Sequence, residues 1–264
     1  MQAVKNNVFG TAITAKCAVE HGVKRFVLIS TDKAVNPTNV MGATKRLAEK
    51  VIEAYNTLGK TEFTAVRFGN VLGSHGSVVP LFERQIRAGG PITLTHPDIV
   101  RFFMTMPEAA SLVLQTASIA KGGELFVLDM GQPVRIMELA ERMNSLYAAQ
   151  GGTPVKIVCT GLRPGEKLYE ELLVATEGVS RTQNEKIFVT QPEVSTLEEL
   201  GGILERLRTS MHSDAAMRAC LHDILPEYKE PEEVNRAAEE HHQAEEHSAE
   251  RAPLPNVSAS PQGA

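Results

Sequence analysis

Residues 25–33, Arg-Phe-Val-Leu-Ile-Ser-Thr-Asp-Lys, decide the fold of this 264-residue chain. Their first six residues form a short, continuous apolar run, which is typical of a strand buried on both faces of a sheet. Apolar residues at three- and four-residue steps predict a helix before it, over 4–21, and another after it, from Val40 to about Leu58. A second apolar strand follows at 63–68. The order helix, strand, helix, strand predicts one half of a doubly wound α/β sheet.

The same patterns predict further elements downstream. Helices are expected over 81–87, 105–120, 136–147, 196–209 and 213–224, and strands over 124–128 and 156–159. We therefore expect three parts: residues 1–80 as the C-terminal half of a Rossmann-like dinucleotide-binding domain, 81–228 as a smaller α/β substrate-binding region, and 229–264 as an acidic tail. The tail has no aromatic residue to bury, so it cannot offset its ordering entropy and is predicted to be disordered.

The composition argues against several classes of protein. Lys and Arg number 27 against 32 Asp and Glu, a net charge of −5, and eight Glu against three basic residues in 229–264 account for all of it. A neutral body without Trp and with 5% aromatic residues argues against a nucleic-acid binder. The three Cys form no C-x-x-C pair, so neither disulfides nor a Cys-based metal site is expected, and a reducing cytoplasm fits best. No apolar run reaches the roughly 18 residues that insertion across a membrane requires.

Asp32 and Lys33 directly follow the first predicted strand, and ligands of doubly wound sheets bind beyond the carboxyl ends of the strands. An acid and a base on one wall of a cleft serve general acid–base chemistry when their surroundings separate their pKa values. The alternative is a surface turn with an exposed ion pair. Met41 and Lys45 follow on one face of the next helix, one turn apart, and this context favours a site.

The segment from Ser30 to Lys45, Ser-Thr-Asp-Lys-Ala-Val-Asn-Pro-Thr-Asn-Val-Met-Gly-Ala-Thr-Lys, resembles the active-site segment of the nucleotide-sugar 4,6-dehydratases of bacterial polysaccharide biosynthesis, within the extended short-chain dehydrogenase/reductase superfamily. The likeness continues through 67–74, 93–105 and 161–167, and it covers nearly all of residues 1–228 in one collinear order. It implies a lyase that holds NAD or NADP, oxidises C4 of UDP-N-acetylglucosamine, eliminates water across C5 and C6, and returns the hydride to C6. The product would be a 4-keto-6-deoxy sugar.

The resemblance also implies roles for individual residues. Lys33 would remove the C5 proton, and Asp32 would protonate the departing C6 hydroxyl. This division of labour requires a lysine of lowered pKa and a neutral aspartic acid. Lys45 would hold the nicotinamide ribose, and Ser30 or Thr31 would donate a hydrogen bond to the C4 oxygen.

Met41 departs from the pattern of the superfamily, most of whose members have Tyr at this position. A thioether cannot act as a general base, so deprotonation of the C4 hydroxyl would fall to Thr31, a bound water or Lys33. The large membrane-anchored dehydratases of the family look similar here, with Met in place of Tyr. We therefore interpret Met41 as a marker of that subfamily.

The nucleotide side of the site is expected to involve residues farther along the chain. By resemblance, Asn70 and Val71 would contact the cofactor, and Asn70 also the sugar nucleotide. Arg163 precedes a predicted helix start, where a guanidinium and free N–H groups together favour a phosphate. Arg101 and Glu166 would complete the nucleotide pocket.

The Gly-rich turn and ribose selector of a dinucleotide-binding fold are not in this sequence. We therefore expect a C-terminal fragment or truncated product of a dehydratase, active only with an N-terminal half. One alternative is a silent remnant or interaction module that still binds a UDP-sugar or pairs with a full-length homologue. Another is a nucleotide-sugar epimerase, although Asp-Lys is what elimination needs and C4 epimerisation does not. Homo-oligomers are also expected, as is a cytoplasmic location, with full-length relatives anchored in the inner membrane.

Overall fold

The computed structural model describes residues 1–74, 76–171, 178–192, 194–230 and 232–236. Most of the predicted acidic tail, residues 229–264, lies outside the described residues. Within the described ranges, no helix combines the length and the apolar character that crossing a membrane would need.

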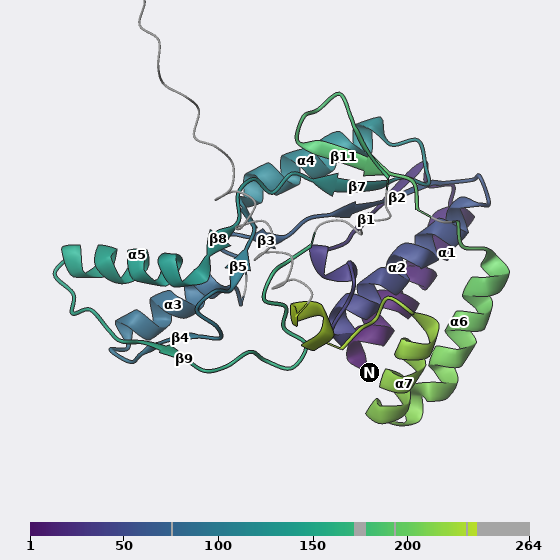
Figure 1. Ribbon diagram of the computed structural model, residues 1–264. Helices are drawn as coiled ribbons and strands as arrows, with labels where there is room; N and C mark the ends of the chain where they lie inside the picture. Colours follow the sequence, from purple (N-terminus) through teal and green to yellow (C-terminus); the bar gives the residue numbers. More distant parts are fainter. Residues whose placement is uncertain (75, 172–177, 193, 231, 237–264) are drawn as a thin grey trace, which may run out of the picture.

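A five-stranded sheet forms the centre of the molecule (Figure 1). Its order is β1 (Arg25–Ile29), β2 (Glu62–Arg67), β7 (Leu125–Leu128), β11 (Ile187–Thr190) and β10 (Val179–Arg181). The first three strands are parallel, and the last two are antiparallel to their neighbours. The predicted α/β class with a Rossmann-like parallel sheet is thus confirmed.

Helices cover both faces of this sheet (Figure 1). On one face lie the π-helical segment η1 (Val4–Phe9), α1 (Gly10–Glu20), α2 (Val40–Asn56), α6 (Leu197–Thr209) and α7 (Asp214–Ile224), the last two joined by the 3₁₀ turn η3 (Ser210–His212). The opposite face packs against α4 (Met106–Ile119). Strands β2 and β7 are buried on both sides because apolar side chains of successive residues face these two helical layers.

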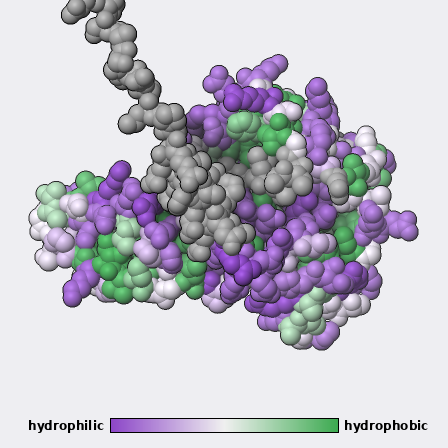
Figure 2. Space-filling model, viewed as in Figure 1, coloured by the Kyte–Doolittle hydropathy of each residue, from purple (hydrophilic) through white to green (hydrophobic). Residues whose placement is uncertain are grey.

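A smaller lobe projects from the sheet, at the left of Figure 1. It consists of α3 (Val78–Arg87), α5 (Ile136–Ala149) and the parallel pair β4 (Ile92–Leu94) and β9 (Ile157–Cys159), and it has its own apolar core. Two short strand pairs connect the lobe to the sheet: β3 (Asn70–Val71) with β6 (Phe103–Met104), and β5 (Val100–Arg101) with β8 (Val134–Arg135). The face seen in Figure 2 is mostly hydrophilic, with hydrophobic residues in small groups.

The central sheet does not end at the predicted domain boundary at residue 80, because it contains strands from both sides of that boundary. Strands β7, β11 and β10 come from the range 81–228, and α6 and α7 from the same range pack against α2. The apolar run of β7 continues the parallel sheet because it pairs with β2, at Val66 and Phe126. The chain therefore leaves the sheet at residue 68, builds the smaller lobe in two excursions, and returns.

Candidate active site

The segment that connects β1 to α2 places Asp32 and Lys33 at the carboxyl end of the sheet. A single 3₁₀ turn, η2 (Asp32–Ala34), follows the strand, and the Asp32 N–H donates to the Phe68 carbonyl at 3.2 Å. The first turn of α2 packs directly on this segment at Gly42, where a Cβ atom would lie 2.1 Å from the Lys33 carbonyl oxygen. Only glycine allows this approach, so Gly42 fixes the position of the Asp-Lys turn.

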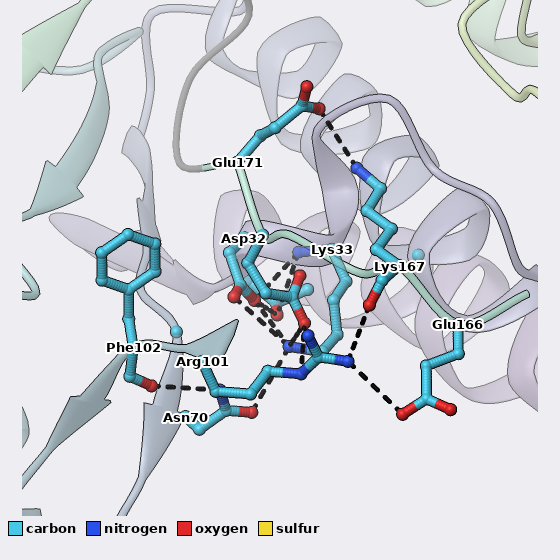
Figure 3. Close-up of polar contacts among 12 residues, drawn as sticks. Asp32, Lys33, Asn70, Arg101, Phe102, Glu166, Lys167 and Glu171 are labelled. Carbon is cyan, nitrogen blue, oxygen red and sulfur yellow. Dashed lines mark hydrogen bonds and ion pairs between the residues drawn. The ribbon is translucent and has the colours of Figure 1, made fainter. Parts of the chain in front are cut away.

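The ammonium of Lys33 is held by groups from three segments of the chain (Figure 3). Its Nζ atom lies 3.0 Å from Asp32 Oδ1, 3.0 Å from Glu170 Oε1 and 3.4 Å from Asn70 Oδ1. The Thr31 hydroxyl donates to Asp32 Oδ1 at 2.7 Å. The structure thus brings the predicted residues Thr31, Asp32, Lys33 and Asn70 together, and it adds Glu170.

Burial and the two carboxylates set the proton affinities here. The side chain of Asp32 is 0% exposed, and burial, with the nearby Glu170 charge, raises the pKa of Asp32 despite the opposing effect of Lys33. A raised pKa is the direction that the proton-donor role expected of Asp32 requires. Burial by itself would lower the pKa of Lys33, but Glu170 and Asp32 outweigh burial and raise it. The expected lowered pKa of Lys33 is therefore wrong, because sequence reasoning missed the Glu170 carboxylate.

Arg101 ties the segment after β9 to β5. Its Nε atom lies 3.2 Å from Glu170 Oε1, and its NH2 atom lies 3.4 Å from Glu166 Oε1. The same guanidinium donates to the carbonyl oxygens of Lys167, at 2.9 Å, and Leu168, at 3.3 Å (Figure 3 shows the first). Five donors in a planar fork suit such a bridging position, which a lysine could not fill.

Residues 163–166 form a tight turn rather than a helix start. The Glu166 N–H donates to the Arg163 carbonyl at 2.9 Å, and Gly165 has φ +80°, which Pro164 before it and a type II turn require. Glu166 Oε2 accepts the Arg163 N–H at 3.0 Å. The helix predicted after Arg163 is therefore absent from the described residues, and a carboxylate occupies the N–H group that was expected to face a phosphate.

The turn is held against the start of α2. The Thr38 hydroxyl and the Asn39 side-chain amide both donate to the Gly165 carbonyl, at 2.9 and 3.0 Å. A Cβ atom at position 165 would lie 2.8 Å from the Asn39 Cβ atom. This contact fixes Arg163 and Glu166 relative to the Asp-Lys turn.

A cavity of about 610 Å³ opens beside these groups, between the sheet and the smaller lobe. Predicted site residues that line it are Thr31, Lys33, Asn70, Val71, Arg101, Arg163 and Glu166. A second cavity of about 300 Å³ is lined by Lys33, Arg101, Arg163 and Glu166 as well, and also by Met41 and Glu170. The shared residues make the two cavities parts of one cleft, large enough for a ligand of nucleotide-sugar size.

Ser30 and Lys45 line neither cavity. Ser30 is buried, and its hydroxyl donates to Glu49 Oε1 at 2.6 Å, inside the core. The Lys45 Nζ atom donates to the Ile29 carbonyl at 3.0 Å, and burial lowers the pKa of this lysine more than Glu49 raises it. The structure therefore places both residues beside the cleft rather than in it.

The end of β1 offers a place for the nicotinamide end of a dinucleotide. Ile29 and Met41 are 42% and 40% exposed, which is high for apolar side chains beside a buried sheet, and Lys45 lies next to them. In the described residues β1 pairs only with β2, so its other edge is open. These residues fit a nicotinamide ribose, whereas no Gly-rich segment for the diphosphate occurs in the sequence.

Fold and cleft together define a Rossmann-like protein whose polar residues gather at the carboxyl ends of parallel strands. A family model described as "Polysaccharide biosynthesis protein" matches residues 1–192. The chain belongs to this family.

Two relatives illustrate the range of the family and its neighbours. The capsular polysaccharide biosynthesis protein CapD of Staphylococcus aureus is 50% identical over 218 residues, which are 82% of this chain and 36% of the relative. A UDP-glucose 4-epimerase of Rickettsia canadensis is 36% identical over 187 residues, 70% of this chain and 53% of the relative. The chain thus spans between about a third and a half of the length of these relatives. The resemblance to nucleotide-sugar dehydratases and epimerases is confirmed at this coarser level.

Solved structures share the fold. Pen from Bacillus thuringiensis is 39% identical, with a TM-score of 0.67, over 72% of this chain and 59% of that one. DesIV, a dTDP-glucose 4,6-dehydratase of Streptomyces venezuelae solved with NAD bound, has a TM-score of 0.58 at 23% identity, over 64% of this chain and 57% of that one. The second likeness shows the fold alone.

Proposed function

We propose that this chain carries the acid–base residues and the sugar-nucleotide cleft of a nucleotide-sugar 4,6-dehydratase that acts on UDP-N-acetylglucosamine. One observation carries the proposal: the buried Asp32 carboxyl and the cavity-facing Lys33 amine lie 3.0 Å apart at the carboxyl end of β1. Elimination of water across two adjacent carbons needs a base and an acid that reach both.

The cofactor we propose is NAD or NADP, which accepts the C4 hydride when bound. The NAD found in a solved neighbour of the same fold supports this choice. In this chain, Lys45 and the exposed Met41 and Ile29 side chains would hold the nicotinamide end. The sequence supplies no Gly-rich turn for the diphosphate of the cofactor, so activity would depend on a further segment or chain.

Lys33 and Asp32 divide the proton transfers. A ketone at C4 acidifies the C5 proton, which Lys33 takes in its free-amine form. Asp32, whose pKa is raised by burial, donates its proton to the leaving C6 hydroxyl. As the pH rises, the free-amine fraction of Lys33 increases and the protonated fraction of Asp32 decreases, so the rate depends on both groups.

The polar residues across the cleft would bind the nucleotide. Arg101 and Arg163 line both cavities and supply positive charge for a diphosphate. Asn70 faces Lys33 and would orient the sugar. Thr31 lines the larger cavity and would donate a hydrogen bond to the C4 oxygen, or accept its proton, in place of the missing Tyr.

The epimerase similarity supports a second candidate, a nucleotide-sugar 4-epimerase. An epimerase needs no proton donor at C6, so the buried Asp32 beside Lys33, with its raised pKa, favours the dehydratase. A silent remnant that only binds a UDP-sugar or pairs with a full-length homologue is the remaining alternative. We propose a cytoplasmic, oligomeric enzyme, as the reduced cysteines and the family resemblance suggest.

The test is an assay of two forms: the 264-residue chain, and its fusion to the N-terminal portion of the Staphylococcus aureus relative. Each is supplied with NAD and UDP-N-acetylglucosamine, and the product is identified by mass spectrometry. We expect a 4-keto-6-deoxy product from the fusion at least, and a loss of roughly 10²–10⁴-fold or more in Lys33→Ala. Lys60→Ala, at an exposed lysine after α2, is the matched control and should keep full activity. If neither form makes product, the dehydratase proposal fails.

A further inference from the structure

Glu170 lies between the two cations of the cleft, and the elimination described above assigns it no role. Its Oε1 atom is 3.0 Å from Lys33 Nζ and 3.2 Å from Arg101 Nε. The side chain is 3% exposed, and Oε2 is buried without a hydrogen-bond partner among the described residues. A buried acceptor left unsatisfied weakens the fold, so its presence points to a functional role.

The groups around the Lys33 ammonium come from four elements. Asp32 precedes it on the η2 turn, Asn70 lies on β3, and Glu170 belongs to the segment after β9. Arg101, on β5, contacts the same oxygen of Glu170 from the other side. Asn70 is uncharged, and Asp32 is the proposed proton donor to the leaving hydroxyl. Glu170 is therefore the carboxylate that remains to balance the charge of Lys33.

We propose that Glu170 is a positioning residue: it aims the Lys33 amine at the cleft beside Asp32, and it stabilises the ammonium that forms when Lys33 takes the C5 proton. This inference rests on the proposed function, because only a lysine that acts as a base changes charge during the reaction. In that step the C5–H bond breaks, its electron pair is conjugated with the C4 ketone, and the proton joins the Nζ lone pair. Glu170 exchanges no proton in this step and keeps its contact with Arg101 at 3.2 Å.

The arrangement follows the logic of a Ser-His-Asp triad, in which a buried carboxylate orients the base and stabilises its protonated form. The geometry of this cleft adds a second cation, Arg101, on the same carboxylate oxygen. Glu170 thus joins the residue proposed to take the proton to one proposed to bind the diphosphate.

The charge state of Lys33 can be measured without turnover. The full chain is labelled with acetic anhydride over a pH series, and the extent of labelling at Lys33 is quantified by mass spectrometry. An opposite charge within about 4–6 Å shifts a pKa by roughly 1–3 units, so Glu170→Gln should lower the labelling midpoint of Lys33 by about one pH unit or more. In mildly alkaline buffer this corresponds to roughly tenfold faster labelling. Glu171→Gln is the matched control, because Glu171 pairs with Lys167 at 3.2 Å, and it should leave the midpoint of Lys33 unchanged.

A midpoint that stays in place in Glu170→Gln overturns the inference. Glu170→Asp keeps the negative charge but moves it farther from Lys33, because the side chain is one methylene shorter. The labelling midpoint of Lys33 in this variant should therefore fall between those of the parent and of Glu170→Gln. If circular dichroism shows that the Gln variant does not fold, the Asp variant decides: a midpoint equal to that of the parent overturns the inference. If the labelling midpoint of Lys33 shifts in Glu170→Gln but the protein forms no product, the Lys33–Glu170 pairing is supported and the proposed function is rejected. If product forms but the labelling midpoint of Lys33 is the same in Glu170→Gln as in the parent, the positioning role alone is rejected.

Discussion

Two clusters of buried charge flank the end of β1, and they differ in whether every polar atom has a partner. The closed cluster lies in the core: Glu49 Oε1 accepts from Ser30 and from Arg67 Nε, at 2.6 and 2.8 Å, and Oε2 accepts from Arg67 and Arg46, at 2.8 and 3.0 Å. Burial alone would raise the pKa of Glu49, but Arg67 and Arg46 outweigh burial and lower it. The closed cluster therefore binds α2 to β1 and β2.

The open cluster consists of Asp32, Lys33, Glu170 and Arg101. Lys33 remains 26% exposed and faces the cavity, and Glu170 keeps one oxygen without a partner among the described residues. Both carboxylates that touch Lys33 raise its pKa, and Asp32 carries a raised pKa of its own. The difference shows that buried charge alone does not identify a functional site. A functional site is identified by polar atoms that lack a partner and by access to a cavity.

The largest stability effect is expected when the closed cluster is broken. Arg67→Leu leaves Glu49 buried without its bidentate partner, and loss of one partner of a buried pair costs about 3–5 kcal/mol. Urea unfolding measures the change. Lys33→Met in the open cluster should cost about 1 kcal/mol or less, because Lys33 is partly exposed and Arg101 still pairs with Glu170. Equal losses in the two variants would remove the distinction between the clusters.

A smaller, pH-dependent effect is expected at Glu53, which borders the closed cluster. Burial raises the pKa of Glu53 to about 7, and Arg46, which it contacts at 3.8 Å, offsets only part of this. Since the folded pKa exceeds the ordinary value of 4.5, ionisation of Glu53 disfavours the fold: no penalty exists below about pH 4.5, and it grows up to about pH 7. Glu53→Gln should therefore stabilise the protein at about pH 8, on the order of 2 kcal/mol, and much less at about pH 5. Thermal unfolding across this range tests the sign, and a stability gain that does not change with pH would contradict it.

The smallest effect is expected from the frame of the open cluster. Gly165→Ala places a Cβ atom 2.8 Å from the Asn39 Cβ atom at φ +80°, so it should cost about 1–2 kcal/mol and also weaken UDP binding, because Arg163 and Glu166 move with the turn. Gly22→Ala is the matched control: Gly22 has φ +65° and nothing within 4 Å of its Cβ position. Gly22→Ala should also lose stability, because alanine is strained at a positive φ, but it should leave UDP binding, measured by calorimetry, unchanged. Equal binding by both variants would show that the turn does not shape the cleft.

Much of the fold could be predicted from local patterns. The apolar runs of β2 and β7 form buried strands, and the periodicity of α2 forms a helix, as predicted. The run of β1 also forms a strand, but it is only partly buried rather than buried on both faces. Strands β10 and β11 were missed because they are short, and β10 is exposed throughout. Pairing with β7 and β10, which local patterns do not show, makes Ile187–Thr190 a strand. The boundary at residue 80 failed for a related reason, since sequence patterns do not show which sheet a strand joins.

The site was predicted in part. Lys33, Asn70, Arg101 and Glu166 all line the cleft, and the fully buried Asp32 contacts it through Lys33. Glu170 was missed since it lies in a charged run, 166–171, that has the sequence pattern of an ordinary solvated segment. Its one signal is its position, four residues beyond Glu166 and directly after the Arg163–Lys167 segment. The pKa direction of Lys33 could not be predicted without it.

The central claim, that Asp32 and Lys33 carry out elimination, is tested most directly by the reaction in D₂O. The fusion described above is incubated with NAD and UDP-N-acetylglucosamine, and the product is analysed by mass spectrometry and NMR. The account predicts a nucleotide sugar that has lost one water and carries deuterium at C5, with both changes lost in Lys33→Ala. A product of unchanged mass, inverted at C4 and free of deuterium at C5, would contradict the account and identify an epimerase.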